Sequence, residues 1–121
     1  PKALPALLKA EKMQKKAASC GFDWDNPQDV FNKIKEELCE VQEAAEEKNH
    51  EHLEEEIGDL LFAVVNYARH MKINSSEALR KCTEKFDRRF RYVEQHCNLE
   101  KVDLKEMDYF WEEAKKSEKR K

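Results

Sequence analysis

The chain has 121 residues and a formal net charge of −3, and charged and apolar residues each make up 40% of it. With only two glycines and three prolines, this composition favours one domain of helices joined by short connections. The small net charge points to neither a nucleic-acid-binding nor a membrane-surface protein, and no stretch has the about 20 apolar residues of a membrane-spanning helix.

The four cysteines lie far apart and form no CxxC pair. A zinc site or a disulfide framework is therefore the less favoured interpretation, and reduced thiols in a cytoplasmic protein the favoured one. Cys39 and Cys82 fall at helical positions, where cysteine often acts as a small buried apolar group. Because the chain begins at Pro1 and shows no signal peptide, we interpret residues 1–121 as a single domain cut from a longer protein.

The first predicted helix covers about residues 4–19, and Gly21 can end it. Its expected apolar positions include Leu4 and Met13. The loop that follows has the sequence CGFDWDNP and carries the aromatic residues Phe22 and Trp24.

Asn26 followed by Pro27 is a typical helix start, and the second predicted helix runs from there to about Lys48. The polar sequence KNHEH separates it from a third helix, whose apolar residues recur at helical spacing over residues 53–68. The short break makes the two helices antiparallel neighbours. The apolar face of the third helix is broader than one small chain can cover, so we expect a homodimer.

Two capping-box patterns mark further helix starts: Asn74 with Glu77, and Asp103 with Glu106. The fourth and fifth helices follow them, and the charged tail, residues 115–121, is expected to fray. The predicted fold is all-α, a dimeric bundle of about five helices in each chain.

Acidic side chains fall within the apolar faces of the second and third helices. Glu37 lies three residues after Ile34 and four before Val41, in the middle of an apolar stripe. Glu56 lies in the same way within the stripe of the third helix. Burial of a lone carboxylate is costly, and each of these acids has another one turn further along. The pairs are Glu37 with Glu40, and Glu56 with Asp59.

Antiparallel packing would bring the two pairs face to face in a partly buried patch. Such carboxylates would repel one another and take up protons unless a cation bound them. Mg²⁺ favours oxygen ligands and commonly holds substrate phosphates as well. We interpret the four acids as Mg²⁺ ligands, with Mn²⁺ as a substitute. The alternative is a solvated, glutamate-rich helix face, which we keep for the other glutamates of these helices.

The fourth helix contains the basic sequence EKFDRRFR, with Lys85 and Arg89 one turn apart on one face and Arg88 beside them. Arginine can bind phosphate oxygens through two donors. Acids for Mg²⁺ together with a basic pair are the arrangement that a polyphosphate substrate requires. The alternative is an ordinary exposed basic face.

The sequence KIKEELCEV followed by EEEIGDLLFAVVNYARH resembles the EExxE…ExxD signature of the MazG family of all-α nucleoside triphosphate pyrophosphohydrolases. LPALLKAEKMQKKAASCGFDW and EKFDRRFRYVE are similar to the segments that flank this signature in the second, catalytic domain of MazG proteins. The resemblance covers nearly the whole chain. It implies Mg²⁺-dependent hydrolysis of nucleoside triphosphates to monophosphate and pyrophosphate, with broad specificity in nucleotide-pool control or house-cleaning.

The resemblance also implies roles for individual residues. The four acids would ligate Mg²⁺, and Glu36, with Lys33, would lie beside the nucleotide and the metal-bound water. Glu36 or Glu40 is the candidate general base. Lys85 and Arg89 would hold the triphosphate. Whether the α or the β phosphorus is attacked stays open.

Other residues keep two interpretations. Trp111 would contact the base or ribose, or else pack in the core beside Phe110. Asn66 would reach the nucleotide, or else pack at the dimer seam. Phe22 and Trp24 are wall or core residues in the favoured interpretation, and stack on the base in the other.

Two rival functions remain. Four-helix di-iron proteins repeat a Glu-x-x-His motif on two helices. Here only Glu47 to His50 has that spacing, and it falls at a helix end. The second rival is a non-catalytic dimeric helical module of a larger protein, which would be expected to have lost some of the four acids; all four are present.

Overall fold

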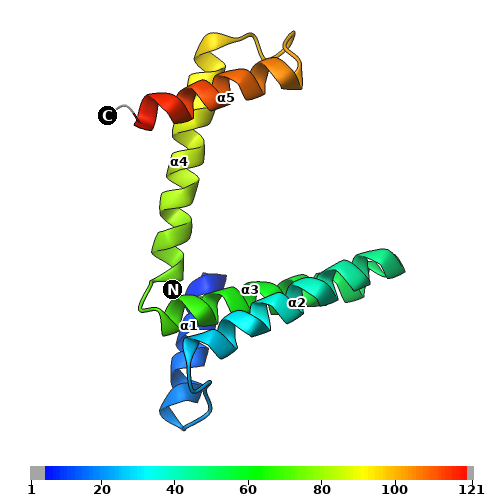
Figure 1. Cartoon of the computed structure of the whole chain (residues 1–121), viewed down its shortest axis with the longest axis vertical. Coiled ribbons are helices and arrows are strands. Elements are labelled where there is room, and N and C mark those ends of the chain that lie inside the picture. The colour runs from blue at the N-terminus through cyan, green and yellow to red at the C-terminus, as the bar shows by residue number, and fades with distance from the viewer. Residues whose placement is uncertain (1–4, 120–121) are drawn as a thin grey trace. The chain divides into compact units, whose positions relative to one another are not determined.

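The computed structural model describes residues 5–119, and within that range it contains helices and no strand (Figure 1). The all-α prediction is therefore confirmed. None of the helices in this range is long and apolar enough to span a bilayer. The five helices are α1 (Ala6–Ser19), α2 (Pro27–Glu47), α3 (His50–His70), α4 (Ser75–His96) and α5 (Leu104–Lys119).

The predicted helix starts are confirmed by their caps. Asn26, Asn74 and Asp103 each accept a hydrogen bond from the backbone N–H three residues further on, at 3.1, 3.1 and 2.9 Å. Asn49 caps α3 in the same way, at 3.1 Å, although the sequence analysis treated it only as part of a polar break. These side chains satisfy backbone donors that have no partner within the helix.

The end of α1 also follows the prediction. Gly21 has a φ of 89°, a left-handed conformation that favours glycine, and its N–H donates to the carbonyl of Ala18 at 2.9 Å. The predicted start at Leu4 lies outside the described residues.

The chain divides into two compact units, one ending at Ala78 and one beginning at Leu79, and each is described by itself. In the first unit α2 and α3 form an antiparallel hairpin, and α1 packs against α3 (Figure 1). The hairpin is confirmed; its turn places Lys48 in the left-handed region, with a φ of 60°. Small apolar residues fill the contact between these helices: Val30, Ala44, Ala63 and Val65.

The inner face of α1 differs from the prediction. Met13 is 54% exposed, whereas the polar residues Glu11 and Gln14 are buried. The reason is a polar contact between helices: Gln14 Nε2 donates a hydrogen bond to the backbone carbonyl of Phe62 in α3, at 3.0 Å. A side chain that bonds to a backbone group of another helix is not revealed by apolar periodicity.

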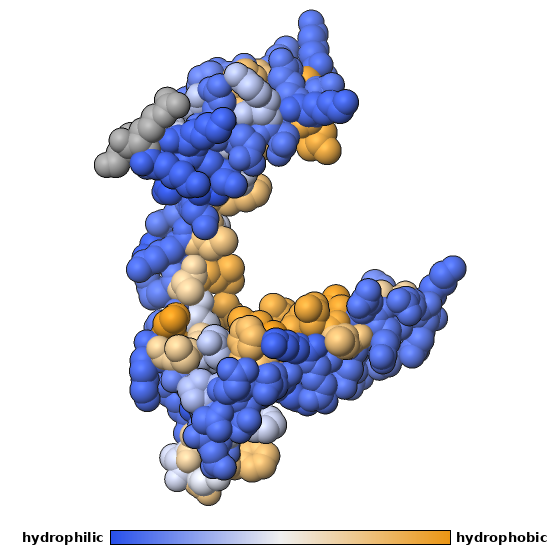
Figure 2. All heavy atoms as spheres, in the orientation of Figure 1, coloured by the Kyte–Doolittle hydropathy of each residue, from blue (hydrophilic) through white to orange (hydrophobic). Residues whose placement is uncertain are grey.

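The described residues of the first unit leave a broad apolar face of the α2–α3 hairpin uncovered. Leu38, Ile57, Leu61 and Val64 are 57%, 42%, 55% and 44% exposed. Figure 2 shows apolar side chains gathered along this hairpin. Exposed apolar surface of this kind marks an interaction site.

The second unit consists of α4 from Leu79 onward and α5. Its core contains the buried Val93 and Ala114, and the rings of Phe86 and Trp111 lie 5.0 Å apart. α5 continues as regular helix to Lys119, so the expectation that the tail frays is wrong for residues 115–119. Residues 120–121 lie outside the described residues.

All four cysteines are unbridged. Cys39 and Cys82 are exposed, so the expectation that they are buried is wrong. Both lie on helix faces that no other part of their own unit covers.

Candidate active site

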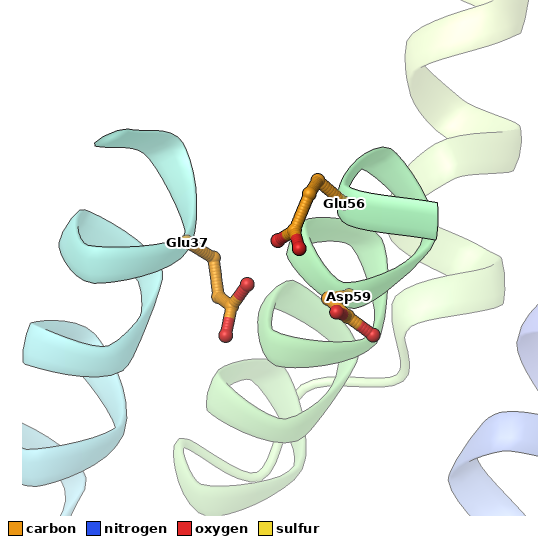
Figure 3. A group of neighbouring side chains, drawn as sticks. All are labelled: Glu37, Glu56 and Asp59. Carbon is orange, nitrogen blue, oxygen red and sulfur yellow. The ribbon is translucent and has the colours of Figure 1, made fainter. Parts of the chain in front are cut away.

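Carboxylates from α2 and α3 meet at the centre of the hairpin. Glu37 of α2 and the α3 residues Glu56 and Asp59 each offer an oxygen, and these oxygens all lie within 4.8 Å of one another. In Figure 3, Glu37 projects from its helix toward the two α3 acids. Glu37 is 5% exposed and Glu56 9%, whereas Asp59 is exposed. Three of the four acids predicted to lie together therefore form one cluster.

Two carboxylate oxygens of this cluster have no partner. Glu37 Oε1 pairs with Lys33 Nζ at 3.0 Å, and Glu56 Oε1 pairs with His52 Nε2 at 3.2 Å. Oε2 of Glu37 and Oε2 of Glu56 are both buried and have no hydrogen-bond partner among residues 5–119. An unpaired buried carboxylate oxygen costs free energy. Because a hard divalent cation supplies the missing positive charge and accepts oxygen ligands, these residues fit such an ion.

Glu40, the fourth predicted ligand, is half-buried next to the cluster. A hydrogen bond to Glu56, partial desolvation and the nearby charge of Glu37 raise the pKa of Glu40 to about 7. Partial desolvation and the charges of Glu37 and Glu56 also raise the pKa of Asp59. The negative charge of neighbouring acids contributes to both pKa shifts, and a bound cation would offset it.

Lys33 and Glu36 lie beside the cluster: Lys33 is one turn before Glu37 on α2, and Glu36 is the residue directly before Glu37. Lys33 Nζ is 3.0 Å from Glu37 Oε1 and 3.5 Å from Glu36 Oε1. The hydrogen bond to Glu37 is the main cause that raises the pKa of Lys33. The Glu36 side chain is 58% exposed, so its carboxylate is open to a ligand from solvent.

His52 is a neighbour of the cluster that the sequence analysis missed. Its ring nitrogens lie 3.1 Å from Glu47 Oε2 and 3.2 Å from Glu56 Oε1. The hydrogen bond to Glu47 is the largest of the effects that raise the pKa of His52. The four-residue spacing from His52 to Glu56, which places both on one helix face, was the available signal.

The predicted phosphate-binding residues belong to the second unit. Lys85 is exposed on α4. Arg88 and Arg89 both bind Glu118 of α5, with Nε–Oε1 distances of 3.3 Å from each arginine. The Arg89 guanidinium lies 5.8 Å from the centre of the Trp111 ring.

The position of Trp111 bears on its two interpretations. The residue is half-buried, and its ring packs against Phe86 of α4 at 5.0 Å. Phe110, its expected neighbour in the core, instead contacts His96 and Tyr109, at 5.3 and 5.2 Å. Trp111 therefore joins α5 to α4 and also flanks Arg89.

Asn66 lies further along α3 than the acids. Its Oδ1 accepts a hydrogen bond from Arg69 Nη2 at 2.7 Å. It also lines a largely apolar pocket of about 560 Å³, together with Phe22, Trp24 and Phe62. Phe22 is 82% exposed and Trp24 45%, so both are wall residues of this pocket rather than core residues.

The loop that carries these aromatic residues is tied to α3 by Asp23. Arg69 donates to both Asp23 oxygens, at 3.1 and 2.6 Å, and His70 Nε2 lies 2.9 Å from Oδ1. The hydrogen bonds from Arg69 hold the pKa of Asp23 well below its usual range. The sequence analysis did not identify this anchor, because its partners are more than 40 residues away.

Comparisons with known proteins find relatives over nearly the whole length of the chain. The chain is 44% identical, over 98% of its length, to the nucleoside triphosphate pyrophosphohydrolase of Escherichia coli (strain K12). It is 43% identical, over 93% of its length, to the nucleoside triphosphate pyrophosphohydrolase/pyrophosphatase MazG of Thermotoga maritima. It covers 48% and 45% of these two proteins, so the chain spans about half the length of the curated relatives it matches.

A further relative is the uncharacterized protein YabN of Bacillus subtilis, at 48% identity over 99% of this chain and 26% of that protein. The profile of the MazG nucleotide pyrophosphohydrolase domain matches residues 25–94, which is more than half of the chain and includes all four acids. The chain belongs to the MazG nucleotide pyrophosphohydrolase domain family.

Proposed function

We propose that this chain hydrolyses nucleoside triphosphates to nucleoside monophosphate and pyrophosphate with the help of Mg²⁺. The observation that carries the proposal is the meeting of Glu37, Glu56 and Asp59, with two buried carboxylate oxygens left unpaired. The names of two relatives, both nucleoside triphosphate pyrophosphohydrolases, support the same reaction.

In this proposal Glu37, Glu40, Glu56 and Asp59 hold Mg²⁺, for which Mn²⁺ can substitute. When bound, the ion neutralises phosphate charge and lowers the pKa of a water molecule. Glu36 or Glu40 accepts the proton of the attacking water. Support for Glu36 comes from its exposure and its contact with Lys33; support for Glu40 comes from its position next to Glu37 and Glu56.

The proposed phosphate-binding groups are cations of α4: Lys85, Arg88 and Arg89. Arginine suits this role because its planar donors match two oxygens of a phosphate. We further assign nucleotide contacts to Lys33 beside the acids, to Asn66 in its apolar pocket and to Trp111 beside Arg89. These assignments follow the family resemblance.

We also propose that the protein acts as a cytoplasmic homodimer and binds no nucleic acid. The uncovered apolar face of the α2–α3 hairpin supports self-association, because its residues are apolar, adjacent and half exposed. The alternative function, a non-catalytic dimeric module, predicts the same surface, so only an activity assay separates the two.

The test is a panel of canonical and damaged nucleoside triphosphates incubated with Mg²⁺, with Mn²⁺ or with a chelator. The proposal predicts that monophosphate and pyrophosphate, identified by ³¹P NMR, form in the two samples with metal. Neither product should form in the sample with chelator. Hydrolysis in ¹⁸O-labelled water shows which phosphorus is attacked, because the label enters the product that water attacked. No turnover of any nucleotide by a folded, metal-binding dimer would favour the non-catalytic module.

A further inference from the structure

Two consecutive arginines of α4 meet one carboxylate in the last turn of α5. Glu118 Oε1 accepts from Nε of both Arg88 and Arg89, at 3.3 Å in each case. Glu118 Oε2 lies 3.0 Å from Nε and 3.0 Å from Nη2 of Arg89. The Glu118 carboxylate thus contacts the Arg89 guanidinium through both of its oxygens, and its Oε1 also accepts from Arg88.

This contact differs from the other ion pairs formed by α4 residues. Arg91 pairs with Asp87 one turn away on the same helix, and the two side chains are 70% and 59% exposed. Such exposed pairs contribute little free energy. Arg89 and Glu118 join two helices instead, and their side chains are only 18% and 29% exposed. The face of Trp111 flanks the same guanidinium at 5.8 Å.

The carboxylate satisfies the donors that a phosphate would use. A carboxylate and a phosphate present oxygens of similar spacing to the planar guanidinium, and both bind it through paired, charge-assisted hydrogen bonds. Two anions cannot accept from the same N–H groups at once. A phosphate that binds Arg89 through Nε and Nη2 must therefore displace Glu118.

We infer that Glu118 is an internal counter-anion that occupies Arg88 and Arg89 in the free protein and competes with polyphosphates for them. This inference deepens the proposed function and depends on the assignment of these arginines to phosphate binding. The competition favours ligands of high negative charge, since these displace a carboxylate more readily than singly phosphorylated molecules do. It therefore helps a triphosphate to enter and a monophosphate to leave.

The test compares Glu118→Gln, which keeps the shape of the side chain and removes its charge, with Glu112→Gln. Glu112 is a matched control because it lies on the same helix and pairs with Lys115, at 3.7 Å, rather than with an arginine of α4. Both variants change the net charge equally. Inorganic tripolyphosphate is titrated into each protein without divalent metal, by calorimetry and by NMR of the arginine Nε–Hε signals.

We expect Glu118→Gln to bind tripolyphosphate about threefold to tenfold more tightly than the unmodified protein, because the anion that competes for the arginines loses its charge. Glu112→Gln should change the affinity by no more than about twofold, since Glu112 pairs with Lys115 rather than with the arginines. In the unmodified protein the Arg89 Nε–Hε signal should move on titration as the carboxylate is exchanged for phosphate. A disturbed fold would weaken binding, so tighter binding cannot arise from structural damage.

Equal or weaker binding by Glu118→Gln would overturn the inference, and weaker binding would show that Glu118 instead holds Arg89 in place. The gain in tripolyphosphate affinity caused by Glu118→Gln must also disappear when Arg88 and Arg89 are both replaced by Ala. A gain in affinity that persists without the arginines would overturn the inference too. Pyrophosphate release from nucleotides is measured separately. A protein that hydrolyses no nucleotide but shows the predicted exchange would refute the proposed function and leave the inference standing.

Discussion

Glu37 and Glu56 lie on the two opposite helices of the α2–α3 hairpin. Among the described residues, each has one buried oxygen without a hydrogen-bond partner, while its other oxygen is paired with a basic side chain. Lys33 and His52 thus compensate only half of each carboxylate. Oxygens of Glu37, Glu56 and Asp59 lie within 4.8 Å of one another, so a cation bound there would relieve the remaining negative charge.

Replacing Glu56 by Gln removes one of the negative charges that would bind a cation. We expect the rate of hydrolysis to fall by about 100-fold or more. Even substitution of residues that only support the metal ligands commonly lowers metal affinity or activity by about tenfold to 100-fold. Mg²⁺ should also no longer raise the melting temperature, since a ligand stabilises only the state that binds it. Activity assays and thermal melts with and without Mg²⁺ measure both effects. Glu54→Gln, an exposed neighbour on α3, is the control, and full activity in Glu56→Gln would refute its role as a ligand.

Replacing Arg89 by Ala should raise KM for a triphosphate about tenfold, because a charge-assisted, bidentate contact is lost. Arg89→Lys should recover only part of the loss, since an ammonium group cannot present two parallel donors. Steady-state kinetics on both variants measure this. Arg91→Ala serves as control, because Arg91 is exposed and pairs with Asp87 one turn away along its own helix. Unchanged kinetics with a lowered melting temperature would assign Arg89 a structural role.

The contacts of Asp23 with Arg69 and His70 predict that the stability of the fold depends on pH. The pKa of Asp23 is depressed in the folded state below its ordinary value of 3.8, so its contribution to stability is fully present above about pH 4 and is lost as the pH falls. Asp23→Asn should lower the free energy of unfolding near neutral pH, and the difference from the unmodified protein should shrink below about pH 4. Urea titrations at several pH values measure the difference. A constant difference across the range would exclude the linkage.

The uncovered face of the hairpin predicts self-association. Leu61→Glu should convert a dimer to a monomer, because a charge placed in an apolar interface is costly to desolvate. Leu104→Glu is a suitable control, since Leu104 is an equally apolar residue of α5 that is 76% exposed. Sedimentation velocity distinguishes the two states. Dimers that persist in Leu61→Glu, or a monomeric unmodified protein, would contradict the proposal.

The sequence was most informative where local chemistry decides the structure. Asn26, Asn74 and Asp103 cap helices because the donors they satisfy lie only three residues away. Glu37 could be recognised as a buried acid because its neighbours in the stripe are apolar and at helical spacing. From there, an antiparallel hairpin was sufficient to predict that it faces Glu56.

Features that depend on distant partners were not predictable in this way. Glu118 lies in a charged tail that the composition predicts to fray, but in the structure it is helical and contacts arginines about 30 residues earlier. Gln14 is buried because a backbone carbonyl of another helix accepts its hydrogen bond. Local periodicity contains no information about either partner.

The acids at positions 37 to 59 belong to a single helix–turn–helix segment, whereas the arginines belong to a different compact unit. In the proposed function, the groups that would bind the ion and those that would bind the phosphates are therefore encoded by separate stretches of chain. Substitutions in one stretch leave the residues of the other unchanged, so evolution could alter the two sets of groups separately.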